Sequence, residues 1–225
     1  MFRRLYKKDF EACTEKEPNT PDVLKLLIKR FVSEKCSLAD LRIVTLFVIC
    51  FAGFLRISEG LYLKRCHIDF KDDHCSLYIE NARTDLYREG NYVVLAKTGK
   101  FSCPVQLLHR YITEAGLMEC YDQFIFRAVV LCKKSNKYVL KRKNAPLSYS
   151  RTRELFNQKL TSIGLESHQY GLHSLRSGGA LICANSGTND RLWKKHGRWR
   201  SETGKDGYVE DSLKQRLSVS LNLNI

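Results

Sequence analysis

A run of thirteen residues, IVTLFVICFAGFL from Ile43 to Leu55, is the most hydrophobic segment of the chain and constrains its fold most. A helix needs about twenty apolar residues to span a bilayer, so this run predicts a buried core helix, starting near Leu38, rather than a membrane anchor. The helix ends in GFLRISEG and therefore presents Arg56 and Glu59 from a buried scaffold. A guanidinium in such a place needs an anion, supplied by Glu59, by another carboxylate or by a ligand.

The segments around this run predict an α+β fold that is mostly helical with a small antiparallel β-sheet. Thr20 and Pro21 favour the start of a first helix that runs to about Lys35. Two β-prone runs around a polar loop predict a hairpin with a third edge strand nearby. The remaining expected elements are the hairpin strands at 75–80 and 91–97, a β-prone run at 123–130, and helices at 104–115, 148–164, 172–187 and 188–197.

Charge is the second constraint, because 38 Lys and Arg face 24 Asp and Glu and give a net charge of +14. The basic residues are spread from Arg3 to Arg216, so the folded surface itself should be positive. Such a surface favours a polyanionic partner, most often nucleic acid.

The nine cysteines stand singly and form no C-x-x-C pair, which is typical of the reduced packing thiols of an intracellular protein. Cys66 and His67 could meet His74 and Cys75 across a turn and hold zinc. Adjacent Cys-His pairs fit metal spacing poorly, so the sequence favours no metal site.

The candidate chemistry is concentrated in the last quarter of the chain. His173 and Arg176 are three residues apart, which places them on one face of a helix. Gly178 and Gly179 follow, and their cost in a helix suggests close approach of another backbone. Tyr208 comes 32 residues after Arg176 in a polar segment. A tyrosine hydroxyl is a weak nucleophile, useful only where cations surround the group it attacks.

In order, FLRISE, HSLRSGGA and GRWRSETGKDGY resemble the three signature boxes of the tyrosine recombinase/integrase family, phage-integrase type, over about residues 20 to 220. The phrases ARTDLYREG and CPVQLL are most similar to eukaryotic mobile-element recombinases of the DIRS or Crypton kind. The matched positions are Arg56, Glu59, His173, Arg176, Trp199 and Tyr208. His196 is three residues off the family spacing, so Trp199 takes that position.

The resemblance implies an enzyme of the nucleus that breaks and rejoins double-stranded DNA without metal or other cofactor. Arg56 and Arg176 would hold the non-bridging oxygens of a phosphodiester while Tyr208 attacks phosphorus and becomes joined to the 3′-phosphate. His173 would accept the tyrosine proton or bind a phosphate oxygen. Trp199 would bind phosphate through its ring and N–H without being buried for stability.

One position departs from the family pattern. The family has a lysine in the hairpin turn as general acid, and this chain has Arg83 there, in ARTD. A guanidinium gives up a proton poorly, so either Lys97 or Lys100 replaces it, or the domain has lapsed into a DNA-binding or protein-interaction module. A type IB topoisomerase shares the chemistry and resembles the boxes less closely.

The resemblance also implies a domain organisation. It predicts that residues 1–19 are the linker remnant of a missing N-terminal core-binding domain and that residues 20–225 are the catalytic domain. Leu213, Leu217 and Leu221 repeat at fourfold spacing and give one apolar face of a C-terminal helix. That helix would dock on a neighbouring subunit on DNA, or on its own domain.

Overall fold

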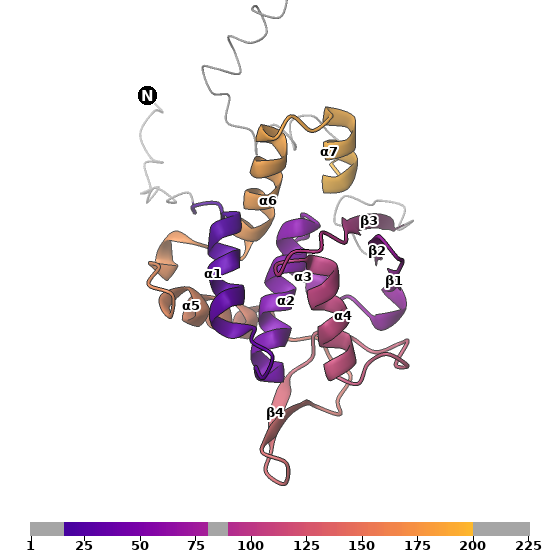
Figure 1. Ribbon diagram of the computed structural model, residues 1–225, viewed down its shortest axis with the longest axis vertical. Helices are drawn as coiled ribbons and strands as arrows, with labels where there is room; N and C mark the ends of the chain where they lie inside the picture. Colours follow the sequence, from indigo (N-terminus) through magenta and orange to yellow (C-terminus); the bar gives the residue numbers. More distant parts are fainter. Residues whose placement is uncertain (1–15, 81–89, 200–225) are drawn as a thin grey trace, which may run out of the picture.

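The computed structural model describes residues 16–80 and 90–199 (Figure 1). It confirms the expected α+β fold: helices dominate, accompanied by small antiparallel sheets. None of the helices in these two ranges is long and apolar enough to cross a membrane. The helices are α1 Pro21–Phe31, α2 Leu38–Ala52, α3 Ile57–Leu61, α4 Pro104–Glu114, α5 Tyr149–Thr161, α6 His173–Asn185 and α7 Asp190–Gly197, with short 3-10 turns at Arg65–His67 and Ser167–Gln169.

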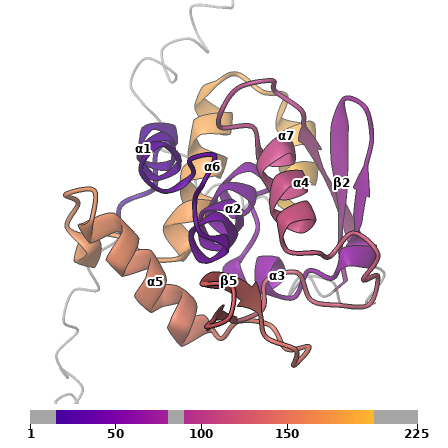
Figure 2. The same ribbon diagram turned by 60° about the horizontal axis from the view of Figure 1, so that its bottom comes forward.

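Helix α2 is the centre of the molecule, with α1, α4 and α6 packed around it (Figure 2). Every residue from Leu41 to Cys50 is buried, which confirms the prediction from the apolar run. Ser37 caps its first turn by accepting a hydrogen bond from the Asp40 amide at 3.1 Å. The helix ends at Ala52 with Gly53 as its C-cap, and the chain then turns through Phe54 toward α3.

Helix α1 begins as expected, with the Thr20 side chain accepting a hydrogen bond from the Val23 amide. It ends at Phe31, earlier than the predicted Lys35. The reason is tertiary, because Arg110 of α4 donates hydrogen bonds to the carbonyls of Ser33 and Glu34 at 2.8 and 3.1 Å. These contacts hold the residues after Phe31 in a turn between two helices.

The predicted hairpin and its edge strand form one three-stranded sheet, β1 Ile68–Phe70, β2 His74–Ile79 and β3 Asn91–Ala96. In the β2–β3 register, Ile79 lies opposite Asn91 and His74 opposite Ala96. The turn of this hairpin is therefore at the Ile79 end. Residues 81–89, which include Arg83, lie outside the described residues.

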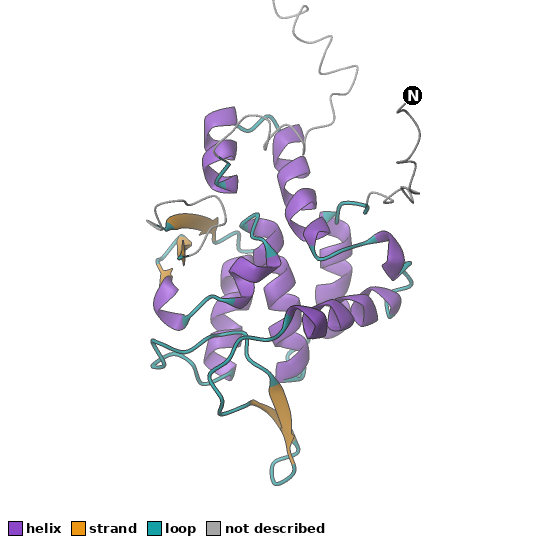
Figure 3. Cartoon of the chain, turned by 180° about the vertical axis from the view of Figure 1, so that it is seen from behind, coloured by secondary structure: helices purple, strands orange, loops and turns teal. Residues whose placement is uncertain are grey.

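A second hairpin, β4 Val129–Cys132 with β5 Lys137–Leu140, extends from the helical body (Figure 3). The sequence predicted a β-prone run at 123–130, but the strand starts at Val129 and its return strand was not predicted. The first part of that run enters the core instead, where Ile125 and Phe126 are fully buried.

Helices α6 and α7 pack through a small cluster of Phe54, Ala180, Trp193 and Trp199. A Cβ atom at Gly178 would lie 1.9 Å from the Asn19 carbonyl oxygen, and one at Gly179 would lie 2.2 Å from that of Phe51. The glycine pair thus permits the close backbone approach that the sequence suggested.

Candidate active site

Three arginines converge where α2 ends. Arg176 of α6 is buried and donates hydrogen bonds to the carbonyls of Phe54 and Gly197, the latter at 2.8 Å. Arg198, just after α7, donates to the same Phe54 carbonyl at 3.1 Å. Arg56 follows two residues after Phe54, as the N-cap of α3. Elements far apart in sequence therefore bring three positive charges together.

Glu59 is the carboxylate that holds this arrangement. Its Oε1 accepts a hydrogen bond from the Arg56 guanidinium at 3.0 Å, and its Oε2 accepts from the Arg56 amide and from Arg198 at 2.8 Å each. The side chains of Glu59 and Arg198 are each 2% exposed, whereas that of Arg56 is 28% exposed. Glu59 therefore fixes the positions of Arg56 and Arg198.

His173 is the first residue of α6 and stays exposed at the surface. Partial desolvation lowers its pKa, and the charges of Arg176 and Arg56 lower it further. The imidazole is therefore neutral near pH 7 and able to accept a proton.

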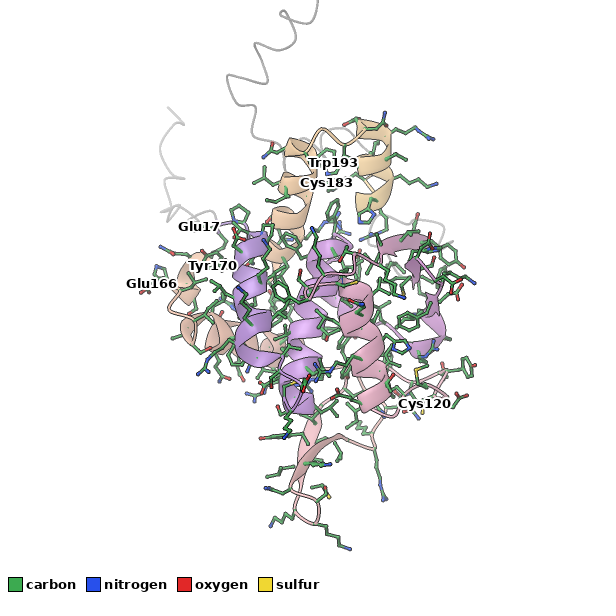
Figure 4. All side chains as sticks on the ribbon, viewed as in Figure 1. Glu17, Cys120, Glu166, Tyr170, Cys183 and Trp193 are labelled. Atoms are coloured by element: carbon green, nitrogen blue, oxygen red, sulfur yellow. The ribbon has the colours of Figure 1, made fainter. Side chains whose placement is uncertain are left out.

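Trp199 is 8% exposed, so the expectation that it need not be buried is wrong. Its ring lies 4.8 Å from that of Trp193 and 6.2 Å from that of Phe54, measured between centroids. The Arg176 guanidinium lies 5.2 Å from the Trp199 ring centroid, in cation–π range. Trp199 thus packs against the buried guanidinium. Its neighbour Trp193, on α7, is labelled in Figure 4.

His196 has a structural role. Its Nε2 donates a hydrogen bond to the Ala52 carbonyl at 2.9 Å, and its ring meets Phe54 edge-on at 4.6 Å. Burial lowers its pKa against the opposing effect of that hydrogen bond, and the charges of Arg198 and Arg176 lower it further. These contacts join the end of α7 to the end of α2.

Arg198 is the residue that sequence reasoning missed. It takes a left-handed backbone conformation, with φ of 58°, as the C-cap of α7. Its partner Glu59 is 139 positions away, so local pattern gives no sign of the pairing. The one signal was Glu59 itself, because a carboxylate on a buried helix end needs cationic partners.

The Ile79 end of β2, rather than Lys97, lies beside Glu59. Ile79 and Glu80, at the turn end of β2, line a pocket of about 230 Å³ together with Ser58 and Glu59. Lys97 follows the opposite end of β3, where its amide donates to the Asp73 carbonyl at 2.8 Å. A strand of six residues spans roughly 20 Å, so the two ends are well separated. Lys100 lies further along and is exposed, and Tyr208 is outside the described residues.

The alternative zinc ligands are engaged elsewhere. His67 Nδ1 accepts a hydrogen bond from the Lys64 amide at 3.3 Å, and His74 Nδ1 pairs with Asp73 at 2.5 Å. Within residues 16–80 and 90–199, no group of three or more His, Cys, Asp or Glu side chains could hold a metal ion.

The sequence pattern that defines the phage integrase family matches residues 20–213. The chain belongs to the phage integrase family. No curated protein matches the sequence closely enough to count as a relative.

Solved structures agree on the fold. The chain is similar to the XerH site-specific recombinase bound to difH substrate in a pre-cleavage complex, with a TM-score of 0.66 and 13% identity over 96% of this chain and 56% of that one. It is similar to the XerA recombinase with a TM-score of 0.65 and 14% identity, over 94% and 66% of the two chains. A lambda integrase dimer bound to a COC′ core site gives 0.57 and 15% identity, over 91% and 51%. The chain thus spans about half the length of the XerH structures.

Proposed function

We propose that this phage integrase domain breaks and rejoins DNA strands at specific sites through a covalent 3′-phosphotyrosyl intermediate at Tyr208. The observation that carries the proposal is the convergence of three guanidiniums, those of Arg56, Arg176 and Arg198, at the end of α2. Guanidiniums held together in this way suit the non-bridging oxygens of a phosphodiester. Recombinase–DNA complexes among the similar structures support DNA as the partner.

Each group has a role that follows from its position. Arg56 is the most exposed of the three guanidiniums, so it is the one a DNA phosphate reaches most easily. Arg176 and Arg198 add positive charge from a water-poor environment, where it stabilises the extra charge of the pentacovalent transition state most strongly. Trp199 holds Arg176 in place from one side.

The proposed reaction is an in-line exchange at phosphorus. The Tyr208 oxygen forms a bond to phosphorus while the bond from phosphorus to O5′ breaks. The neutral His173 takes the phenolic proton, and the departing O5′ takes a proton from water while the charge of Arg83 stabilises it. A free 5′-hydroxyl of another strand then reverses these steps and completes the exchange.

A nicked suicide substrate tests this function. Cleavage releases a short fragment with a free 5′-hydroxyl. Because this fragment diffuses away and cannot reverse the reaction, the protein stays joined to DNA and migrates slowly on a denaturing gel. We expect this adduct with the native chain and none with Tyr208→Phe. The control Tyr170→Phe changes a tyrosine that interacts with Glu17, and this variant should still form the adduct. If the native chain binds DNA and forms no adduct, the proposed strand-cleaving activity is refuted.

A second function is favoured by Arg83 alone: a lapsed recombinase that binds DNA or protein and does not cut. The change Arg83→Lys distinguishes the two, because a lysine ammonium can give up a proton where a guanidinium cannot. A rise in cleavage would mark a lapsed or slowed enzyme with the acid at the turn. A loss of cleavage in Lys97→Ala would instead assign the acid to Lys97, against its position at the far end of β3.

We also propose that copies of the chain associate on DNA through the C-terminal tail. An apolar groove of about 390 Å³ lies between the end of α2, α6 and α7, and the side chains of Ile182 and Leu192 on its rim are 41% and 52% exposed. The tail leucines Leu213, Leu217 and Leu221 of a second copy fit such a groove. Leu192→Glu should then abolish dimers on DNA in sedimentation, with single-copy binding retained; unchanged dimers would refute the docking.

We also propose a domain organisation, a recombinase subgroup and a cellular location. We assign residues 1–19 to a linker and 20–225 to the catalytic domain of a nuclear DIRS- or Crypton-type mobile-element recombinase, because ARTDLYREG and CPVQLL resemble that group. A fluorescent fusion that stays out of the nucleus would contradict the location. A gene without repeated flanking ends would contradict the mobile element.

A further inference from the structure

The hairpin of β4 and β5 is the most positive exposed segment of the described chain. From Gln123 to Arg153 the sequence has nine Lys and Arg and no Asp or Glu. Six of these cations lie at the tip of the hairpin or just after its base at Leu140, all exposed, and no ion pair to them is present within residues 16–80 and 90–199. They are Lys133, Lys134, Lys137, Lys141, Arg142 and Lys143.

The same hairpin exposes apolar side chains on both faces. Val130 lies opposite Val139 and Leu131 opposite Tyr138, and these four side chains are between 39% and 48% exposed. A two-stranded hairpin in water is marginally stable by itself, and this one projects from the body, with Ala128 and Leu140 at its base packed against the core formed by the described residues (Figures 1 and 3). Its shape and composition therefore indicate that a partner covers it.

We propose that the β4–β5 hairpin is a DNA-binding arm that lies in a groove of the duplex beside the cleaved phosphate. This inference rests on the proposed function, which makes DNA the partner. A two-stranded ribbon fits the major groove, about 12 Å wide, and apolar side chains can contact thymine methyl groups there. The lysines at the tip bind the phosphates that border the groove, and the absence of carboxylates from the segment removes repulsion.

The arm and the arginine site lie at opposite ends of α2. The Arg42 guanidinium donates a hydrogen bond to the Arg127 carbonyl, two residues before β4, and Phe54 follows the other end of the helix. Ten helical steps lead from Arg42 to Ala52, the last residue of α2, a rise of about 15 Å. This distance corresponds to about four base pairs, so the arm binds DNA that flanks the cleavage point and adds affinity without touching the reacting atoms.

The test is a salt titration of DNA binding. The triple variant Lys133→Gln, Lys134→Gln and Lys137→Gln should weaken binding to a 40-base-pair duplex. Each lost phosphate contact reduces the slope of log affinity against log salt by about 0.9, so the slope should become shallower by about 2 to 3. The rate of adduct formation at saturating protein should stay unchanged.

A control variant removes the same charge elsewhere: Lys25→Gln, Lys29→Gln and Lys35→Gln, all exposed on or just after α1. An equal fall in the salt slope of both variants would overturn the proposal that the hairpin is a DNA-binding arm, because the effect would then reflect net charge alone. Native-like binding by the hairpin variant would overturn it too. Failure of the native chain itself to bind DNA would instead refute the proposed function, so the two failures are distinguishable.

A photo-crosslinking amino acid in place of Ser135, at the tip, identifies what covers the hairpin. We expect a crosslink to DNA in the complex. A crosslink to a second copy of the chain, with oligomeric state changed by Leu131→Ser and DNA affinity unaffected, would show that the hairpin is a protein contact and refute the arm.

Discussion

The molecule has two positive regions that hold their charges in opposite ways. Around Glu59, the guanidiniums of Arg176 and Arg198 are buried and fixed by backbone carbonyls and a carboxylate. On the β4–β5 hairpin, the lysines are exposed and surrounded by solvent. Fixed charges in a water-poor site stabilise a particular transition state, whereas exposed charges give salt-dependent affinity with little geometric demand. We therefore assign chemistry to the first region and DNA affinity to the second.

The largest effect should come from Arg176→Met, which removes a fixed charge and keeps most of the volume. Loss of one such electrostatic contact typically slows catalysis by about 10²- to 10³-fold, and we expect that loss in adduct formation, with DNA affinity at low salt nearly unchanged. Single-turnover kinetics at saturating protein measures it.

Arg42→Met is the matched control, because Arg42 is also a buried guanidinium bonded to a carbonyl, at the other end of α2. The folded variant should form adduct at the native rate. If it loses as much as Arg176→Met, buried arginines serve stability alone and the distinction between the two regions fails.

A smaller effect is expected from Glu59→Gln, which removes the carboxylate that positions Arg56 and Arg198. Displacement of these guanidiniums by about 1 Å should slow cleavage by up to about 10²-fold, while the more positive site binds DNA at least as tightly. A loss of affinity with an unchanged cleavage rate at saturation would show that Glu59 does not position the site.

The pH dependence of cleavage should reveal His173. Its pKa is lowered by desolvation and by Arg176 and Arg56, so in the free enzyme the imidazole becomes protonated, and unable to accept a proton, only below the ordinary value near 6.5. Adduct formation under subsaturating conditions should be flat from pH 8 down to that value and fall beneath it. His173→Gln should be slow and lose this acidic limb; a variant that keeps the limb would assign it elsewhere.

The smallest effect concerns stability. The pKa of His196 is lowered in the folded state, so below the ordinary value near 6.5 the unfolded chain binds more protons than the folded chain. Acidification through this range should lower the free energy of unfolding, and less so in His196→Gln, where the amide can still donate to Ala52. Urea unfolding at pH 7 and pH 5 measures the difference. An equal loss in both proteins would place the destabilising protonation at other groups.

Local patterns predicted much of this fold. The run from Ile43 to Leu55 is apolar on all sides, as a central helix requires. Strand β2 alternates buried with half-buried residues, and β3 alternates buried with exposed residues over most of its length. The pair Gly178 and Gly179 indicated close backbone contact, and the structure shows which segments make it.

The features that sequence reasoning missed depend on partners distant in the chain. Arg198 pairs with Glu59, which is distant in sequence. Trp199 is buried because the rings of Phe54 and Trp193 pack against it. The strand β5 is only four residues long, so Tyr138 and Val139, which favour strands, give too short a signal before β4 is present to pair with it. Burial and pairing of this kind are tertiary properties.

The most direct test of the account is to identify the protein atom that becomes joined to DNA. The adduct from the suicide substrate can be digested with protease and nuclease, and the modified peptide sequenced by mass spectrometry. We predict a nucleotide attached through its 3′-phosphate to Tyr208. Attachment to any other residue, or no attachment by a chain that binds the substrate, would contradict the assignment of the arginine site as the centre of strand exchange.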